Sequence, residues 1–263
     1  MLLIDQYAYI NRLTKTHPLE KIVLSIFLLV FSLSAKDILV SLLTFLIMST
    51  LTVFVAKIPW KYYLTMLSIP GIFLISSMIS ILISYTQQPE RIHEAVWEYP
   101  LFNGTVYIAS QSIQMCIQLF FSVFSSISCL YFLTLTTPVH DLMHILRKCK
   151  VPQLMIELIE LNYRFIFVFL EISLKIYQAQ NSRLGYLSVK KGLHSLGMLV
   201  ASLFANVFLR SRELTIAMDS RGYHNSMNYL ENSFQYSSKN WTFISIVILF
   251  IIGLYIKFGG VLV

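Results

Sequence analysis

Five long apolar runs constrain this chain more than any other feature of its sequence. A helix needs about 20 mostly apolar residues to cross the hydrocarbon core of a bilayer. Runs of this kind lie near residues 19–35, 37–56, 62–85, 106–136 and 241–258. Charged residues make up only 13% of the chain, whereas a soluble domain averages roughly 25%. The sequence therefore predicts an all-α, polytopic helical membrane protein with about five transmembrane helices.

Basic residues are distributed unevenly among the segments that connect these runs. Arg12 and Lys15 precede the first run, and residues 137–240 hold twelve of the twenty Lys and Arg. Residues 86–105 instead carry three glutamates against one arginine, Arg91. Because Lys and Arg are enriched in cytoplasmic loops, we expect the N-terminus and residues 137–240 to be cytoplasmic and the acidic loop to be outside. The net charge of +7 is thus explained by cytoplasmic loops, and nucleic acid is not an expected partner.

This pattern divides the chain into three parts. Residues 1–136 form a predicted N-terminal transmembrane bundle of four spans, residues 137–240 a cytoplasmic helical region, and residues 241–263 a C-terminal transmembrane helix. The apolar segment 195–209 is shorter than a typical span. At that length an interfacial or protein-buried helix is as common as a span. We favour a helix that does not span, because two similar motifs on either side of it then lie on the same side of the membrane.

The cytoplasmic region begins with a short predicted helix in "TTPVHDLMHILRKCKVP", and Pro152 then opens a longer helix that runs to about Ser182. Polar residues of the longer helix recur at spacings of three, four and seven, which places them on one face. Within this polar stripe, Glu160 with Arg164 and Glu171 with Lys175 form predicted ion pairs at i,i+4. The stripe is either a solvated face of a helix at the membrane surface or a contact with another subunit. Its members are Glu157, Glu160, Arg164, Glu171, Lys175, Gln178 and Ser182.

Two near-copies of one short motif stand out in this region, "AQNSRLGY" at residues 179–186 and "AMDSRGYH" at residues 217–224. In both, an alanine lies one helical turn before an arginine, a serine directly precedes the arginine, and a glycine follows. Glycine in that place suits a helix C-terminus, where it adopts the left-handed cap. Each copy therefore predicts a helix end at which residues with small side chains lie beside the long, positively charged side chain of an arginine. The residues are Ala179, Ser182, Arg183 and Gly185 in the first copy and Ala217, Ser220, Arg221 and Gly222 in the second.

The two arginines have a simple explanation and a functional one. Cations are favoured at helix C-termini, and arginines near a membrane reach toward lipid phosphates. Arginine also offers a rigid fork of five hydrogen-bond donors for carboxylates and backbone carbonyls. The small side chains next to each arginine would let the surface of another protein approach closely. Two copies on the same predicted side favour docking onto two similar partners.

With these motifs in view, the chain resembles the transmembrane T component of energy-coupling factor (ECF) ABC transporters, in its cobalt/nickel, CbiQ-like branch. The resemblance extends over nearly the whole chain. It is carried in order by "IDQYAYINRLTKTHPLEK", "CLYFLTLTTPVHDL", "VPQLMIELIELNYRFIFVFLE" and both arginine motifs. In that family such motifs lie on cytoplasmic coupling helices that dock into grooves of two ABC ATPase subunits.

The resemblance implies a non-catalytic, energy-coupling subunit of a cobalt or nickel importer in the cell membrane. Arg183 and Arg221 would transmit ATP-driven movement from the two ATPase subunits to a substrate-binding (S) membrane subunit. Ala179, Gly185, Ala217 and Gly222 would shape the coupling helices. Leu184 separates Arg183 from Gly185, where the shorter form of the motif has Arg-Gly, so the sequence leaves open whether the two helix ends are capped identically.

Two other functions compete with this interpretation. His140 and His144 lie at i,i+4 in "HDLMH", a spacing that in HExxH proteins binds zinc, so the enzyme alternative is an intramembrane metalloprotease. A glutamate and an evident third ligand are missing; His194 and His224 would serve only if folding brings them close. A stand-alone transporter or channel is the other alternative, although no span carries the internal charge that is typical of ion pathways. The chain has no GxxxxGK[ST] phosphate loop, and we expect no cofactor and no resident metal.

Overall fold

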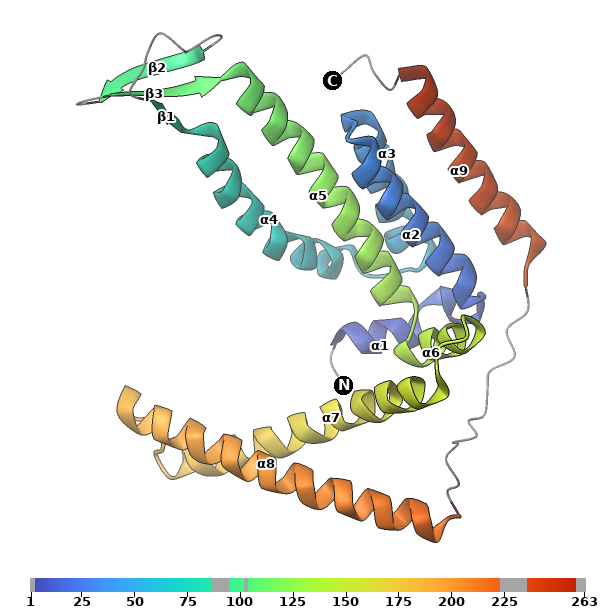
Figure 1. Ribbon diagram of the computed structural model, residues 1–263, viewed down its shortest axis with the longest axis vertical. Coiled ribbons are helices and arrows are strands. Elements are labelled where there is room, and N and C mark those ends of the chain that lie inside the picture. The colour runs from blue at the N-terminus through green and yellow to red at the C-terminus, as the bar shows by residue number, and fades with distance from the viewer. Residues whose placement is uncertain (1–2, 87–94, 102–103, 223–235, 259–263) are drawn as a thin grey trace. The chain divides into compact units, whose positions relative to one another are not determined.

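The computed structural model describes residues 3–86, 95–101, 104–222 and 236–258. The chain divides into two compact units (Figure 1). Residues 2–138 and 233–263 form the first, which we call the bundle unit, and residues 139–232 form the second, which we call the long-helix unit.

The bundle unit consists of helices whose starts are set by local capping. Pro18 occupies the first turn of a helix and the Nδ1 atom of His17 accepts a hydrogen bond from the Leu19 N–H. Asp37 caps the next helix in the same way through Leu39. The helices are α1 (Leu3–Ile10), a 3-10 turn η1 (Arg12–Lys15), α2 (Pro18–Ala35), α3 (Ile38–Thr50), a π-helical turn η2 (Leu51–Val55), α4 (Trp60–Leu82), α5 (Ser110–Thr136) and α9 (Ser238–Phe258).

The core of the bundle unit lies where α2, α3, α5 and α9 meet. Its apolar part includes Leu28 of α2, Met48 of α3, Cys129 of α5 and Ile251 of α9, which are fully buried. Hydroxyl groups join three of the helices at one level: Ser32 donates to Ser125 at 2.9 Å and lies 3.3 Å from Ser41, while Thr44 hydrogen bonds Ser125 as well. Small residues and interhelical hydroxyl bonds of this kind allow transmembrane helices to pack closely.

A small antiparallel sheet joins α4 to α5. Its strands are β1 (Ser84–Thr86), β2 (Ala95–Leu101) and β3 (Gly104–Ala109), in the order β1-β3-β2. This acidic segment was predicted only as a loop, although its β-branched and aromatic residues suit strands. Two of its glutamates, Glu90 and Glu94, lie outside the described residues. The sheet is a local addition to a fold that is all-α, as predicted.

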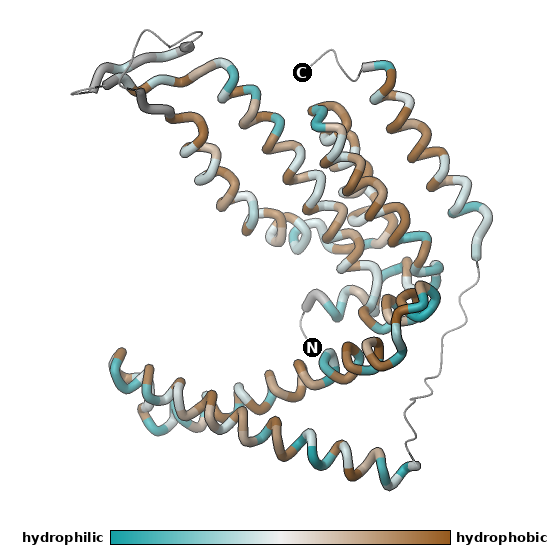
Figure 2. Tube along the Cα trace, viewed as in Figure 1, coloured by the Kyte–Doolittle hydropathy of each residue, from teal (hydrophilic) through white to brown (hydrophobic). Residues whose placement is uncertain are grey.

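The described part of the long-helix unit, residues 139–222, contains three helices: α6 (Val139–Lys148), α7 (Gln153–Ser182) and α8 (Val189–Ser220). The short helix and the long helix ending at Ser182 agree with the prediction. A turn at residues 183–188 joins α7 to α8, where Ser188 caps α8 by accepting from the Lys191 N–H. In Figure 2, apolar residues dominate α2 and α3, whereas polar residues recur along α7 and α8.

Six helices within the described residues are long and apolar enough to cross a membrane: α2, α3 with η2, α4, α5, α8 and α9. Five of them coincide with the predicted spans. The sixth, α8, is a single helix of 32 residues, more than twice the apolar segment 195–209 on which the sequence analysis was based. It is longer because Lys190, Lys191, Arg210 and Arg212 at its flanks are good helix formers. Whether α8 lies on one side of the membrane stays a prediction.

Candidate functional site at two helix ends

The first arginine motif forms the C-terminus of α7. Arg183 is the C-cap, with φ −94° and ψ 13°, and Leu184 follows in the left-handed region at φ 61°. The Gly185 N–H donates to the Gln180 carbonyl at 2.9 Å, and the Leu184 N–H donates to the Asn181 carbonyl at 2.9 Å. These two bonds define a Schellman motif, which satisfies carbonyl groups at a helix end.

The second motif forms the C-terminus of α8 with the same backbone geometry. Arg221 is the C-cap, with φ −94° and ψ 7°, and Gly222 follows in the left-handed region at φ 72°. The Gly222 N–H donates to the Asp219 carbonyl at 3.0 Å, which is the bond that Leu184 makes to Asn181. The structure thus answers the question that the sequence left open, because the two described caps share their backbone conformation.

This equivalence corrects one expectation. Gly185 was predicted to adopt the left-handed cap, but Leu184 does so, and the residue that corresponds to Gly222 is therefore Leu184. Gly185 has a different role. A Cβ atom there would lie 2.7 Å from the Ser195 hydroxyl and 3.0 Å from the Gln180 carbonyl oxygen, so a larger residue would force these neighbours to shift where α8 approaches the end of α7.

The residues around each arginine also correspond. Ser182 donates to the Gln178 carbonyl at 3.0 Å, and Ser220 donates to the Ile216 carbonyl at 2.8 Å, so both hydroxyls fold back onto their own helix four residues earlier. Ala179 and Ala217, one turn before the arginines, are exposed. Each helix end consequently presents a small, smooth surface beside the arginine.

Both arginine side chains are exposed. Among the residues that the structure describes, neither guanidinium has a hydrogen-bond or ion-pair partner. An exposed guanidinium keeps all five donors available for an acceptor on another molecule. The geometry of the two helix ends therefore fits a contact with acceptor groups outside this chain.

A network that the sequence analysis did not predict anchors the first motif. Gln180 donates through Nε2 to the Ser195 carbonyl at 3.1 Å and accepts from the Tyr186 hydroxyl at 2.7 Å. The Ser195 hydroxyl donates to the Gly185 carbonyl at 2.9 Å, and the rings of Tyr177 and Tyr186 lie 4.9 Å apart. No local pattern marks Gln180 or Ser195, because their contact depends on how α8 folds back against α7.

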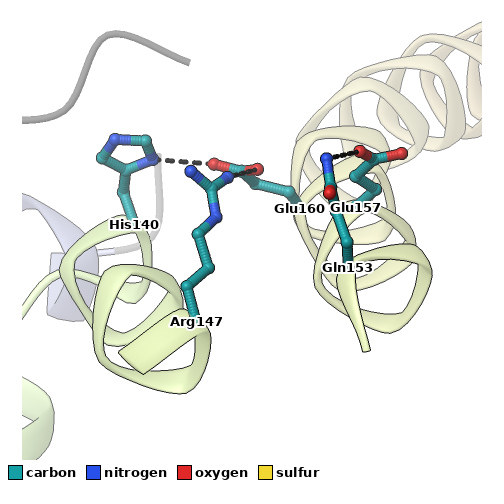
Figure 3. Close-up of polar contacts among 5 residues, drawn as sticks. All are labelled: His140, Arg147, Gln153, Glu157 and Glu160. Atoms are coloured by element: carbon teal, nitrogen blue, oxygen red, sulfur yellow. Dashed lines mark hydrogen bonds and ion pairs between the residues drawn. The ribbon is translucent and has the colours of Figure 1, made fainter. Parts of the chain in front are cut away.

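His140, the first residue of the histidine pair, lies at the junction of α6 and α7 (Figure 3). His140 contacts Glu160 of α7 through Nδ1 at 2.9 Å, and Arg147 reaches the same carboxylate at 3.4 Å. Glu160 thus binds two side chains of α6 in place of Arg164, the partner that the sequence predicted. The prediction was wrong because it considered neighbours on one helix only, whereas the turn before Pro152 folds α6 back onto α7.

The histidines are not part of a larger ligand set in the described residues. No three His, Cys, Asp or Glu side chains converge there in a way that would hold a metal ion. His194 is exposed on α8, and His224 lies outside the described residues. The geometry gives no support to a metalloprotease site.

The polar stripe of α7 changes character along the helix. Near its start, Glu157 is buried and accepts a hydrogen bond from Gln153 at 2.9 Å. Farther along, Glu171 and Lys175 form the predicted i,i+4 pair at 2.7 Å. The hydrogen bond from the Lys175 ammonium group and the positive charge of that group both lower the pKa of the Glu171 carboxyl. The stripe therefore combines a structural contact with α6 and a solvated face.

The spans and the paired helix ends define a multi-pass membrane protein with a separate unit of long helices. The sequence profile of the cobalt transport protein family, CbiQ, matches residues 11–230, and the chain belongs to this family. Members of the family are membrane components of transport systems, and the resemblance to CbiQ-like proteins that the sequence motifs indicated is confirmed.

Individual relatives agree with this assignment. An uncharacterized protein of Methanocaldococcus jannaschii is 32% identical over 251 residues, which cover 95% of this chain and 91% of that protein. The cobalt transport protein CbiQ of Salmonella typhimurium is 25% identical over 84% of this chain and 96% of its own length. A chain of Methanocorpusculum labreanum, named as a fused cobalt transport protein CbiMQ, is 31% identical over 66% of this chain and 28% of its own length.

Proposed function

We propose that this protein is the energy-coupling transmembrane subunit of an ECF-type importer and that Arg183 and Arg221 dock two ATPase subunits. The observation that carries the proposal is the repeated geometry of the two helix ends. Each has an exposed arginine at the C-cap, a left-handed residue after it and an exposed alanine one turn before it. Two equivalent surfaces on one chain fit two copies of the same partner.

The proposal assigns the chemistry to the partners. Cobalt or nickel is the proposed substrate class; cobalt is the ion in the names of the relatives, and nickel follows from the resemblance to the cobalt/nickel branch. ATP hydrolysis takes place in the ATPase subunits, in line with the missing phosphate loop in this sequence. A substrate-binding membrane subunit receives the movement. The fused CbiMQ relative supports a close membrane partner, because in it the region that matches this chain is part of a longer chain.

The proposed orientation follows from the charge distribution. The N-terminus and residues 137–240 face the cytoplasm, where the ATP is, and the acidic segment faces outward. Both arginines are then accessible to cytoplasmic subunits. A helix α8 that crosses the membrane would instead place Arg221 on the opposite side from Arg183, and only one of the two arginines would be able to dock.

The test reverses the charge of each arginine. Losing one partner of a charge-assisted, partly desolvated interface contact costs about 2–5 kcal/mol, which is tens to thousands of fold in affinity at about 1.4 kcal/mol per tenfold. Arg183→Glu and Arg221→Glu should each weaken association with the ATPase subunits, and the double variant should be worse, because two separate contacts are lost. Lysine should restore only part of the affinity, since it lacks the planar fork.

The chain offers a matched control. Arg212 is an exposed arginine on α8, nine residues before Arg221, and Arg212→Glu makes the same charge change outside the motif. Co-purification, ATPase rate and metal uptake should be near wild type for this variant. A double variant of Arg183 and Arg221 that assembles and transports like Arg212→Glu would show that the arginines only cap their helices. Metal uptake by this chain alone would favour the stand-alone transporter.

A further inference from the structure

A crevice opens in the bundle unit near the first turns of α2 and α9. Its volume is about 130 Å³, close to the roughly 150 Å³ of an engineered apolar cavity that binds benzene. Most of its wall is apolar and comes from four elements: Leu24 of α2, Leu51 and Val55 of η2, Phe132 of α5 and Phe243 of α9. A space of this size takes several carbons of a hydrocarbon chain.

The helical winding changes beside the crevice, directly after α3. Leu51–Val55 is a π-helical turn, in which the Ala56 N–H donates to the Leu51 carbonyl five residues earlier at 2.9 Å. Such turns are rare and often mark functional sites. Both ends of this turn, Leu51 and Val55, line the crevice, so the wider winding and the space coincide.

The charged groups in the wall are already used to hold the helices. Glu20 is 3% exposed and accepts from the Ser237 N–H at 3.2 Å and from the Asn240 side chain at 2.7 Å. Lys21 is 4% exposed and donates to the Thr136 carbonyl at 2.8 Å. These contacts fix the start of α9 against α2 and α5. The remaining space is bounded mainly by apolar side chains, and it therefore suits an apolar occupant.

Two of the side chains that line the crevice are exposed on candidate spans, where we expect them to face the bilayer. Val55 and Phe243 line it and are 41% and 47% exposed, and both belong to candidate spans. Lys15 and Lys239 are exposed, and each lies one residue before a lining residue, Thr16 and Asn240 respectively. Their long side chains are therefore candidates to reach a headgroup at the mouth of the crevice. Apolar walls below a basic rim are complementary to a lipid with an acyl chain and a negatively charged headgroup.

We propose that this crevice binds an anionic phospholipid, with one acyl chain between η2 and α9 and the headgroup phosphate near Lys15 and Lys239. The site lies at the membrane end from which α2 begins, so it draws its lipid from that leaflet alone. A bound acyl chain fills space at the contact between α9 and the rest of the bundle unit. The proposal does not depend on the docking of ATPase subunits.

The test measures which lipid the full-length protein retains. Protein purified in detergent is mixed with dioleoyl-phosphatidylglycerol or dioleoyl-phosphatidylcholine, and bound lipid is counted by native mass spectrometry. Two lysines near a phosphate should favour the anionic lipid by about thirtyfold. The wild type should retain one phosphatidylglycerol after washing. A wild type that retains neither lipid overturns the proposal and leaves the crevice to a protein partner or a segment of the chain.

Two pairs of variants separate the contact with the acyl chain of the lipid from the contact with its headgroup. Val55→Trp fills the crevice from its exposed rim and should reduce retention at least tenfold, whereas Phe54→Trp, at a neighbouring residue that is 74% exposed and does not line the crevice, should retain lipid. Equal retention by these two variants overturns the proposal.

The double change Lys15→Gln and Lys239→Gln leaves the buried wall intact and should abolish the preference for phosphatidylglycerol. The matched double change Lys190→Gln and Lys191→Gln, at exposed lysines of α8, should keep it. An unaltered preference in the first double variant refutes the assigned headgroup position and with it the proposal.

Discussion

Replacing Leu184 by glycine should stabilise the protein relative to alanine at the same position. Leu184 has φ 61°, a conformation in which the Cβ atom of an L-residue crowds the following carbonyl group. Within a helix the opposite order holds, since glycine is less stable than alanine there. The sign of the difference between alanine and glycine therefore reports the backbone conformation at residue 184.

The magnitude follows from two opposing terms. The left-handed conformation costs a residue with a Cβ roughly 1–2 kcal/mol, and the greater freedom of glycine in the unfolded chain costs roughly 0.5–1 kcal/mol. Leu184→Gly should thus be more stable than Leu184→Ala by about 0.75 kcal/mol, the difference between the midpoints of these two ranges, since both variants lose the same exposed leucine side chain. At about 2–4 °C per kcal/mol for a protein of this size, the melting temperature should differ by about 1.5–3 °C.

The assay is thermal unfolding of the purified variants in one detergent, and the structure supplies two controls. Ala179→Gly makes the same chemical change within α7 and should lower the free energy of unfolding by roughly 0.5–1 kcal/mol. Gly222→Ala should also destabilise, because Gly222 has φ 72°. If Leu184→Ala proved more stable than Leu184→Gly, residue 184 would be right-handed, and the equivalence of the two helix ends would fail.

Two further predictions concern topology and the histidine pair. A cysteine at Asn103, in the acidic segment and outside the described residues, should react with an impermeant thiol reagent applied to intact cells. A cysteine at Ser188 should not react, and its labelling would contradict the cytoplasmic assignment of residues 137–240. Replacing both His140 and His144 by Gln should leave metal uptake within a few-fold of wild type, since the link from α6 to Glu160 is retained by Arg147, whereas loss of stoichiometric bound metal together with all activity would revive the enzyme alternative.

The membrane character of this protein could be predicted from the sequence because it depends on local composition. A span is recognised by an apolar stretch of sufficient length, and five of the six candidate spans in the described part of the chain were found in this way. The long helix that ends at Ser182 and the pair of Glu171 with Lys175 were also found, because helical periodicity acts within a few residues. The family was recognised from motifs that are themselves short stretches of sequence.

The arginine motifs were found by their repeated spacing, but their geometry was predicted only in part. The sequence placed both arginines at helix ends, which is correct. It assigned the left-handed cap to Gly185, because glycine is the usual residue there. Leu184 takes that conformation instead, because it directly follows the C-cap residue Arg183, which is the left-handed position of a Schellman motif.

What only the tertiary structure decided are contacts between residues that are distant in the chain. Glu160 binds His140 and Arg147 of α6 in place of Arg164 on its own helix. Glu20 binds Asn240, which lies 220 residues later. Hydropathy and periodicity describe one segment at a time, whereas these pairings arise when separate segments pack together. The sequence by itself thus determined five spans, the family and the two candidate arginines. The packing of helices determined which distant side chains Glu160 and Glu20 bind, because those partners lie on other helices.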